Sequence, residues 1–378
     1  MCGTYAPERD GVADHVRLLA AHLVPAGVEP LVAAAGAGAP YSLASRWDAA
    51  GVAAAGRALA GLEPDVVHVH WAPSAYGFRG AVGLLPLALP RGLPVVTTMH
   101  EYGGWARPAR LPAGLWPRVE RHGWDRETLL LGPRSAAVVV TNEAHARTVR
   151  ERLGREPTLL PLGPNVEPVA ATGAAARAEF GLPVGVPVVT FFGFVHPVKG
   201  IRYLLDAVAR LRAGGHPELR LLVVGAVESL ALRGTESAAF EAELRAQIAG
   251  LGLQGAVTLT GWVPSRQVSM ALRAADVGAL PFTHGVTAKS GSLLAAYSHG
   301  LPLVVTEGGD DAVVGVRCTP RDALSLAAGL DRLLRSATLR AELAGGGLER
   351  ARERSWPRIA VAHRRVYDAA RRAVATGG

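Results

Sequence analysis

The chain has 378 residues, of which 49% are hydrophobic and 19% are charged, and it carries a formal net charge of +8. This length exceeds what a single hydrophobic core accommodates, so we expect two domains. No apolar run approaches the ~18 residues of a membrane-spanning helix, and two cysteines cannot make a disulfide framework or a multi-cysteine zinc site. The N-terminal residues lack a signal-peptide pattern, which favours a cytoplasmic protein.

The basic residues are spread along the chain and do not form blocks. A positive charge suits phosphorylated ligands, but no aromatic RNA-binding motif or paired Cys/His finger accompanies it, so we expect no nucleic-acid partner. Only Lys199 and Lys289 are lysines among the 40 Lys and Arg residues. In a chain that otherwise uses arginine, these two lysines are candidates for a specific role.

The first half alternates short apolar runs with segments of helix length. A helix is expected to open on a glycine-containing turn at residues 10–27, and strands are expected at 65–71, 94–100, 136–142 and 158–165. Strands separated by helices indicate parallel βαβ units. Residues 1–5 offer little for a first strand, so we expect that strand to be short or the chain to begin a few residues late.

The pattern restarts after a Pro/Ala/Gly-rich stretch at 166–176. Strands are expected at 186–194, 219–226, 256–261, 277–282 and 302–306, and an amphipathic helix at 200–215. Two doubly wound α/β halves of this kind place a ligand cleft between them. The predicted divisions are a first domain at 1–166, a linker at 167–185, a second domain at 186–355 and a final helix at 356–378.

Metal-site motifs are missing from the sequence. It has no H-E-x-x-H, C-x-x-C or D-x-D spacing, and the adjacent Asp310 and Asp311 suit a turn. His68 and His70 alternate on a predicted strand and therefore face one side. Two such histidines can ligate a metal, but the sequence shows no third ligand, so packing is the favoured interpretation. We expect no metal and no cofactor.

Several segments in order resemble one enzyme family. These are YAPERDGVADHVRLL, DVVHVHW, VVTTMHEYGG, FFGFVHPVKGIRYLLDAV, VTLTGWVPSRQVSMALRAADVGALPF and LLAAYSHGLPLVVT. Together they are similar to family 4 glycosyltransferases, retaining enzymes of the GT-B fold. The resemblance covers almost the whole chain. It implies two Rossmann-like domains, an N-terminal one for the acceptor and a C-terminal one for a nucleotide diphosphate sugar, with a last helix that crosses back to the first domain.

The resemblance also implies where the donor diphosphate binds. The family pairs an arginine with a lysine here, and this chain has Phe194 and Lys199 at those positions. Two family glutamates fall on Thr287 and Ala295, so the usual carboxylates are missing. Lys289 then supplies a charge that Phe194 cannot. The alternatives left open are that Lys199 is a solvated surface lysine and that the loop holds a stray lysine.

A glycine-bearing loop that contains Lys289 precedes a helix expected to begin at residues 290–292, and this loop suits the diphosphate leaving group. Ser290, Gly291 and Ser292 open that helix, and free amides at a helix N-terminus bind phosphate; an ordinary serine N-cap is the alternative. The catalytic candidates are His100, Lys199 and Lys289. The donor-binding candidates are Gly11, Gly193, Trp262, Val263, Thr287, Ser290, Gly291, Ser292 and Glu307. The acceptor-binding candidates are Asp14, His70, Glu101 and Asn142.

The leading hypothesis is a retaining, metal-independent glycosyltransferase acting on a saccharide or small natural product, with secondary metabolism as a plausible setting. One alternative is a silent or pseudo-glycosyltransferase of the same fold, since charged family residues are replaced. A sugar-nucleotide epimerase is a weaker alternative, because its chemistry needs carboxylates. The Trp- and Arg-containing segment 105–124 suits a polyol-like acceptor or a membrane surface, but its prolines weaken the membrane interpretation.

Overall fold

The computed structural model describes residues 1–5, 11–35, 38–43, 46–104, 123–227, 234–288, 290–308 and 313–376. Contacts divide the chain into two compact units. Unit 1 comprises Met1–Gly163 and Arg354–Gly378, and unit 2 comprises Pro164–Glu353. The expected divisions after residues 166 and 355 lie within three residues of these limits. Each unit is described by itself below.

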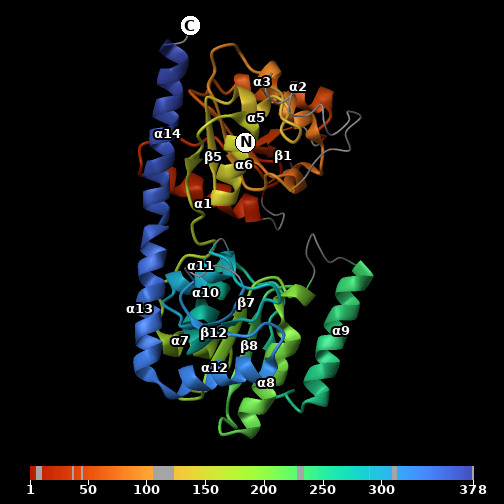
Figure 1. Cartoon of the computed structure of the whole chain (residues 1–378), viewed down its shortest axis with the longest axis vertical. Coiled ribbons are helices and arrows are strands. Elements are labelled where there is room, and N and C mark those ends of the chain that lie inside the picture. The colour runs from red at the N-terminus through yellow and green to blue at the C-terminus, as the bar shows by residue number, and fades with distance from the viewer. Residues whose placement is uncertain are drawn as a thin grey trace. The chain divides into compact units, whose positions relative to one another are not determined.

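Unit 1 is built on parallel strands that read as one series of βα units (Figure 1). Its strands are β1 (Ala33–Ala35), β2 (Tyr41–Leu43), β3 (Val67–Trp71), β4 (Val95–Met99), β5 (Ala137–Val140) and β6 (Thr158–Leu159). Its helices are α1 (Gly11–Leu23), α2 (Ala49–Ala60), α3 (Leu85–Ala88), α5 (Leu131–Arg134), α6 (Glu143–Leu153) and α14 (Trp356–Thr376), with the 3-10 turns η1 (Pro73–Tyr76) and η2 (Gly80–Leu84).

Met1 and Cys2 occupy a strand position between β1 and β3. The Met1 ammonium donates to the carbonyl of His68 at 2.7 Å, and the Cys2 amide donates to the carbonyl of Ala33 at 3.1 Å. The series is therefore β2, β1, Met1–Cys2, β3, β4, β5 and β6. This is a doubly wound order whose direction reverses between Met1–Cys2 and β3.

Unit 2 holds a parallel sheet of six strands in the order β12-β11-β10-β7-β8-β9 within the described residues. The strands are β7 (Val188–Phe192), β8 (Arg220–Val224), β9 (Val257–Leu259), β10 (Val277–Leu280), β11 (Leu303–Thr306) and β12 (Val316–Cys318). The helices are α7 (Gly173–Glu179), α8 (Ile201–Ala213), α9 (Gly234–Gly250), α10 (Ser265–Ala274), α11 (Gly291–Ser298), α12 (Ala323–Arg335) and α13 (Ala337–Glu353), with the 3-10 turn η4 (Pro197–Lys199).

The core of unit 2 follows from its sequence pattern. Strands β7, β8 and β10 consist mainly of apolar residues and are almost wholly buried, as expected for parallel strands covered on both faces. Helix α8 buries an apolar stripe that includes Ile201, Leu204 and Val208.

Three predictions about elements need correction. The strand expected at 158–165 contains only Thr158–Leu159, since Pro161 and Pro164 cannot donate to a ladder. The expected linker at 167–185 contains helix α7, capped by the Thr172 side chain. Strands β1, β2 and β12 were not predicted; β1 is three alanines, which have low strand propensity.

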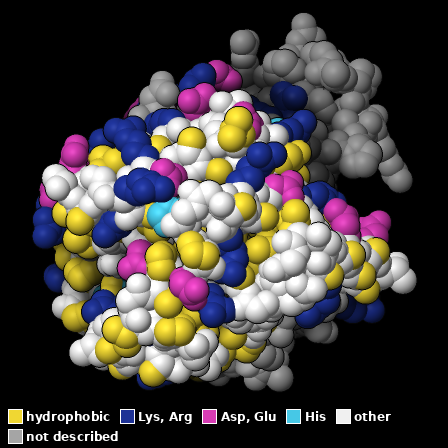
Figure 2. All heavy atoms as spheres, turned by 90° about the horizontal axis from the view of Figure 1, so that it is seen from below, with side chains coloured by type: hydrophobic (Ala, Val, Ile, Leu, Met, Phe, Trp, Pro, Cys, Tyr) yellow, Lys and Arg dark blue, Asp and Glu magenta, His cyan; other side chains and the backbone are white. Residues whose placement is uncertain are grey.

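The helices and the surface were compared with what a membrane or a nucleic-acid partner would need. No helix in the described ranges combines the length and the apolar character needed to cross a membrane. On the face drawn in Figure 2, basic side chains are scattered among acidic and hydrophobic ones and form no single patch. The predicted lack of a nucleic-acid partner stays a prediction.

An engineered extension should stabilise unit 1. A cavity of about 580 Å³ is lined in part by Met1, Leu31, Val32, Val66 and Val67, beside the Met1–Cys2 strand position. Burial lowers the pKa of the Met1 ammonium, which marks a cost for its charge. A short run of valine and isoleucine before Met1 would fill this space and replace the ammonium by an amide.

We expect that extension to raise the free energy of unfolding by at least about 1.5 kcal/mol, the value of one buried side chain. Denaturant unfolding of the chain measures it. A Gly-Ser extension of equal length is the control, and equal stability of the two would contradict the prediction.

Candidate functional site

Histidines from several elements of unit 1 gather at one place. Helix α1 contributes a residue from its buried face, strand β3 contributes two that point to one side, and others follow β4 or lie on α14. These residues are His15, His68, His70, His100 and His363. The point lies where the strand order of unit 1 reverses, which is the usual ligand position of a doubly wound sheet.

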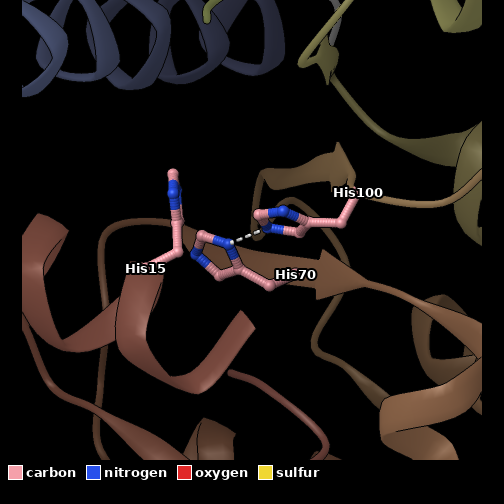
Figure 3. A group of neighbouring side chains, drawn as sticks. All are labelled: His15, His70 and His100. Carbon is pink, nitrogen blue, oxygen red and sulfur yellow. Dashed lines mark hydrogen bonds between the residues drawn. The ribbon is translucent and has the colours of Figure 1, made fainter. Parts of the chain in front are cut away.

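The rings differ in how they are held. Both ring nitrogens of His68 are bonded, Nδ1 to the Tyr367 hydroxyl at 2.8 Å and Nε2 to Thr98 Oγ1 at 2.7 Å. His70 Nδ1 lies 3.1 Å from His100 Nε2 (Figure 3). By contrast, His15 Nε2 and His363 Nε2 are buried and have no hydrogen-bond partner. A buried polar atom left in this state is costly and marks a place for a ligand or water.

Burial makes this cluster neutral. Desolvation, aided by neighbouring imidazoles, lowers the pKa of His15, His68 and His70 well below the usual value of 6.5. The same causes lower the pKa of His100 to about 3, and desolvation lowers that of His363 to about 4. Each ring is therefore uncharged near neutral pH. In this state His100 is a poor base but a good hydrogen-bond partner for a hydroxyl group.

Of the predicted acceptor residues, some belong to this histidine cluster or adjoin it, and others make separate contacts. His70 and His100 are in direct contact, and Asp14 precedes His15 on α1. Glu101 is exposed and accepts from the Ser74 hydroxyl at 3.2 Å. Asn142 caps α6, because its side-chain oxygen accepts from the His145 amide. Gly11, a donor-binding candidate, is the exposed first residue of α1.

The candidate donor residues lie at the carboxyl edge of the unit 2 sheet. Its first strand, β7, lies between β8 and β10, so the strand order reverses between β7 and β10. Open α/β sheets bind ligands outside the strand ends at such a point. Gly193 follows β7, and the turn η4 with Lys199 begins after residues 194–196.

Close backbone approaches fix the loop after β7. Gly193 has a φ of 143°, and a Cβ placed on it would lie 2.7 Å from the Ser292 hydroxyl oxygen. A Cβ on Gly225, at the end of β8, would lie 2.0 Å from the Gly193 carbonyl oxygen. Gly200 has a φ of 72°, and its Cβ would meet the carbonyl of Pro281 after β10. Only glycine fits these positions, which brings bare backbone to the edge of the sheet.

Lys199 is held half-buried at this edge. Its ammonium lies 3.6 Å from the centroid of the Phe282 ring, and desolvation lowers its pKa. The Thr283 amide donates to the Val198 carbonyl at 2.9 Å, which ties the turn to the end of β10. Lys199 is therefore partly buried against an aromatic ring and is not a fully solvated surface lysine. Phe194 is 43% exposed.

The helix α11 begins beside Gly193. Ser290 is its N-cap residue, but the Ser290 side chain makes no capping hydrogen bond, unlike an ordinary serine cap. Ser292 lies in its first turn, and Gly291 approaches the Asn165 side chain. Lys289 lies outside the described residues.

The positions of the missing family glutamates are now placed. Thr287 is exposed in the loop before α11, whereas Ala295 is completely buried in the core of unit 2. A carboxylate at residue 295 would need a partner inside this core.

The remaining donor candidates border the same edge. The Gly225 amide donates to the Gly261 carbonyl at 3.2 Å, which places the turn of Trp262 and Val263 beside the end of β8. Trp262 is 52% exposed, and Val263 packs on the core. Glu307 follows β11, and its side chain is exposed. Gly193 and Ser292 therefore lie close together, and Lys199 follows the same strand β7. Trp262, after β9, and Glu307, after β11, lie on opposite sides of them along the edge.

Comparisons with known proteins agree with this geometry. The model for Glycosyltransferase Family 4 matches residues 9–167, and the model described as Glycosyl transferases group 1 matches residues 186–336. A relative from Xylanimonas cellulosilytica called D-inositol 3-phosphate glycosyltransferase is 31% identical over 80% of this chain and 71% of its own length. The chain belongs to glycosyltransferase family 4.

Other relatives carry similar names. A D-inositol 3-phosphate glycosyltransferase from Stackebrandtia nassauensis is 31% identical, and this chain spans about half of it, 52%. A 2-deoxystreptamine glucosyltransferase from Streptomyces kanamyceticus is 29% identical over 56% of this chain and 52% of the relative.

Solved structures confirm the fold of this family 4 member. A glycosyltransferase from Rickettsia africae has a TM-score of 0.71 at 14% identity, and 97% of each chain is covered. HepE from Anabaena, solved with UDP and glucose, has a TM-score of 0.68 at 18% identity and covers 97% of this chain and 98% of its own. The expected GT-B fold, with its Rossmann-like domains, is therefore confirmed.

Sequence reasoning missed part of the histidine cluster. It found His70 and His100, but it saw no third partner for the His68–His70 pair, and the structure supplies His15 and His100. A signal for His363 was present, since Trp356, Ile359, Ala360, His363 and Val366 fall on one helical face. The family resemblance implied that this last helix crosses back to the first domain, where it lies, but the sequence did not show that this face packs against α1.

The histidine cluster should make the stability of unit 1 depend on acidity. His363 has a pKa of about 4 when folded and near 6.5 when unfolded, so the unfolded chain binds more protons between these values. Its contribution is complete above pH 6.5 and is lost as the pH falls toward 4. The slope is at most about 1.4 kcal/mol per pH unit for this ring.

Replacing His363 with glutamine should remove that part of the slope. Urea unfolding between pH 7 and pH 4.5 measures it, and replacement of His284, which is exposed, is the control. An unchanged slope for the His363→Gln variant would show that this ring is not buried in its neutral form.

Proposed function

We propose that this family 4 member transfers a sugar from a nucleoside diphosphate sugar to a hydroxyl group of a small polyhydroxylated acceptor, with retained configuration and without a metal ion. The observation that carries the proposal is the carboxyl edge of the unit 2 sheet. There Lys199, glycine backbone and the start of α11 surround the point where the strand order reverses.

Those features suit a diphosphate. The glycines at 193, 200 and 225 leave room for backbone to approach phosphate oxygens. The ammonium of Lys199 and the first amides of α11 offer positive charge where a diphosphate gains negative charge on leaving. Lys289, one residue before the α11 cap, would add a second ammonium. The nearby turn of Gly261 and Trp262 suits a nucleoside base.

The protonation states favour a mechanism without an enzymic base. A ring with a pKa of about 3 cannot take a hydroxyl proton effectively near neutral pH, and this is the state of His100. We infer that the bond from the anomeric carbon to the diphosphate breaks while the bond to the acceptor oxygen forms on the same face. The acceptor proton then passes to the leaving diphosphate oxygen, and His100 holds a sugar hydroxyl.

A cyclitol is the acceptor class we propose. The relatives named D-inositol 3-phosphate glycosyltransferase and 2-deoxystreptamine glucosyltransferase both have a six-membered carbocyclic polyol in their names. A neutral cluster of imidazoles, with Glu101 and Asp14 nearby, offers hydroxyl and amine partners without a fixed positive charge. We also propose that the protein acts in the cytoplasm, where nucleotide sugars are made.

Lys199 should decide nucleotide affinity. We expect one of UDP, GDP, ADP, CDP and dTDP to bind at micromolar strength, and Lys199→Ala to weaken that binding by at least tenfold, about 1.4 kcal/mol. Titration calorimetry measures both. Arg202→Ala is the matched control, because Arg202 lies one turn along and pairs with Glu243. Unchanged affinity in Lys199→Ala would contradict the diphosphate role, and no binding by any nucleotide would favour a silent homologue.

His100 should matter for transfer but not for nucleotide binding. Because His100 is proposed to hold a hydroxyl of the reacting sugar, His100→Ala should lower kcat by about 100-fold, as for a lost transition-state hydrogen bond. The dissociation constant of the nucleotide should change less than twofold. Steady-state kinetics and calorimetry separate the two, and a parallel loss of nucleotide binding would show that the substitution disturbs more than the reacting centre.

A further inference from the structure

We propose that His15, His70 and His100 form a binding site for a divalent transition metal ion of the zinc type, and that the bound ion inhibits transfer. One ring nitrogen from each residue lies within 4.8 Å of the others. Figure 3 shows the three side chains as neighbours that come from α1, β3 and the end of β4, with His70 and His100 facing one another. The inhibitory part rests on the proposed function, whereas the site itself does not.

The geometry is close to that of a three-histidine zinc site. With Zn–N bonds of about 2.0–2.1 Å, two ligand nitrogens at tetrahedral angles lie roughly 3.3 Å apart. The His70 Nδ1 to His100 Nε2 separation is 3.1 Å. The His15 ring centroid lies 4.8 Å from that of His100 and 5.6 Å from that of His70. The ligand nitrogens of the three residues lie within 4.8 Å of one another, so the His15 nitrogen would move toward the other two to complete three corners of a tetrahedron, and water would take the fourth.

One ligand is already prepared for such an ion. His15 is 93% buried, since its exposed fraction is 7%, and its Nε2 has no hydrogen-bond partner. A metal ion would satisfy this atom. His68 is close to His70, but both of its ring nitrogens are engaged by Tyr367 and Thr98, so it is not a ligand. Those bonds instead hold the wall of the site, as outer partners do in metal centres.

The proton balance is simple. At present one of the two rings donates the hydrogen bond that joins His70 and His100. When a metal ion takes the place of this hydrogen bond, the proton of the donor ring moves to the other nitrogen of the same ring, so no proton is lost. All three rings are neutral imidazoles, the form that ligates Zn²⁺, Ni²⁺ and Cu²⁺. With its Nε2 bound to a metal ion instead of hydrogen-bonded to His70, the His100 ring is fixed and cannot turn that nitrogen toward a sugar hydroxyl, so the ion competes with catalysis.

Binding is tested first, without substrate. The metal-free full chain is titrated with zinc chloride, and cobalt(II) provides the visible absorption of a tetrahedral complex. We expect saturable binding that His15→Asn weakens by at least about 100-fold, because even outer partners contribute 10- to 100-fold. His22→Asn is the matched control on the same helix and should bind zinc normally. Equal zinc affinity and an equal cobalt spectrum in His15→Asn and the unmodified chain would overturn the site.

A second measurement needs no substitution. Nitrogen-15 spectra of the histidine rings in the unmodified protein should show large zinc-induced shifts for three rings, and assignment to any other set of rings would overturn the site. Transfer is then assayed with zinc and with added chelator. Reversible inhibition that His22→Asn retains supports the proposal. Zinc binding at these rings with undiminished transfer would remove the inhibitory role, and zinc binding in a chain that transfers no sugar would contradict the proposed function alone.

Discussion

Burial of several histidines without a compensating charge is the constraint on which unit 1 depends. Helix α14, from the end of the chain, makes this burial possible. Its residues Trp356, Ile359 and Ala360 pack against the apolar face of α1, and its Tyr367 hydroxyl bonds His68. The cluster then lies in a medium that disfavours cations. The resulting rings are neutral, hydrogen-bonded and closely spaced, which determines what they can bind.

Unit 2 has the same doubly wound architecture, but it presents positive charge where unit 1 presents uncharged histidines. Its sheet also reverses strand order at the first strand, but the reversal point there carries a lysine and bare glycine backbone instead of imidazoles. The close contacts of Gly193, Gly200 and Gly225 exclude side chains and fix the loop after β7. One unit therefore offers uncharged hydrogen-bonding groups and the other offers positive charge. This division matches a reaction in which a neutral hydroxyl displaces an anionic diphosphate.

Much of the fold could be predicted from residue patterns. The strands at β3, β4, β7, β8 and β10 are mainly apolar, valine-containing runs of strand length, and their repetition with helices indicated two doubly wound halves. The three-alanine β1 could not be predicted, because its strand state comes from pairing with Cys2 and with β2. Helix α7 was also missed, because its proline-, glycine- and alanine-rich surroundings resemble a linker, although alanine favours helix and Thr172 is a typical N-cap residue.

The part of the candidate site in unit 2 could be predicted, because its residues lie in short sequence motifs. Lys199, Gly193 and Ser292 come from a turn and a helix start, and the fold brings them to one edge. The histidine cluster was not predictable as a unit, because His15, His70, His100 and His363 are joined only by contacts between distant segments. Membership of family 4 adds the expected donor class, but the neutrality of His100 follows only from three-dimensional burial.

The most direct measurement is the configuration of the transferred sugar. The protein would be incubated with nucleotide diphosphate sugars of known α configuration and a cyclitol acceptor, in the presence of a chelator, and the product examined by proton NMR at the anomeric position. An α-linked product formed at full rate in chelator is the predicted result. A β-linked product, or transfer that stops in chelator, would contradict a metal-free reaction in which the leaving diphosphate accepts the proton on the same face.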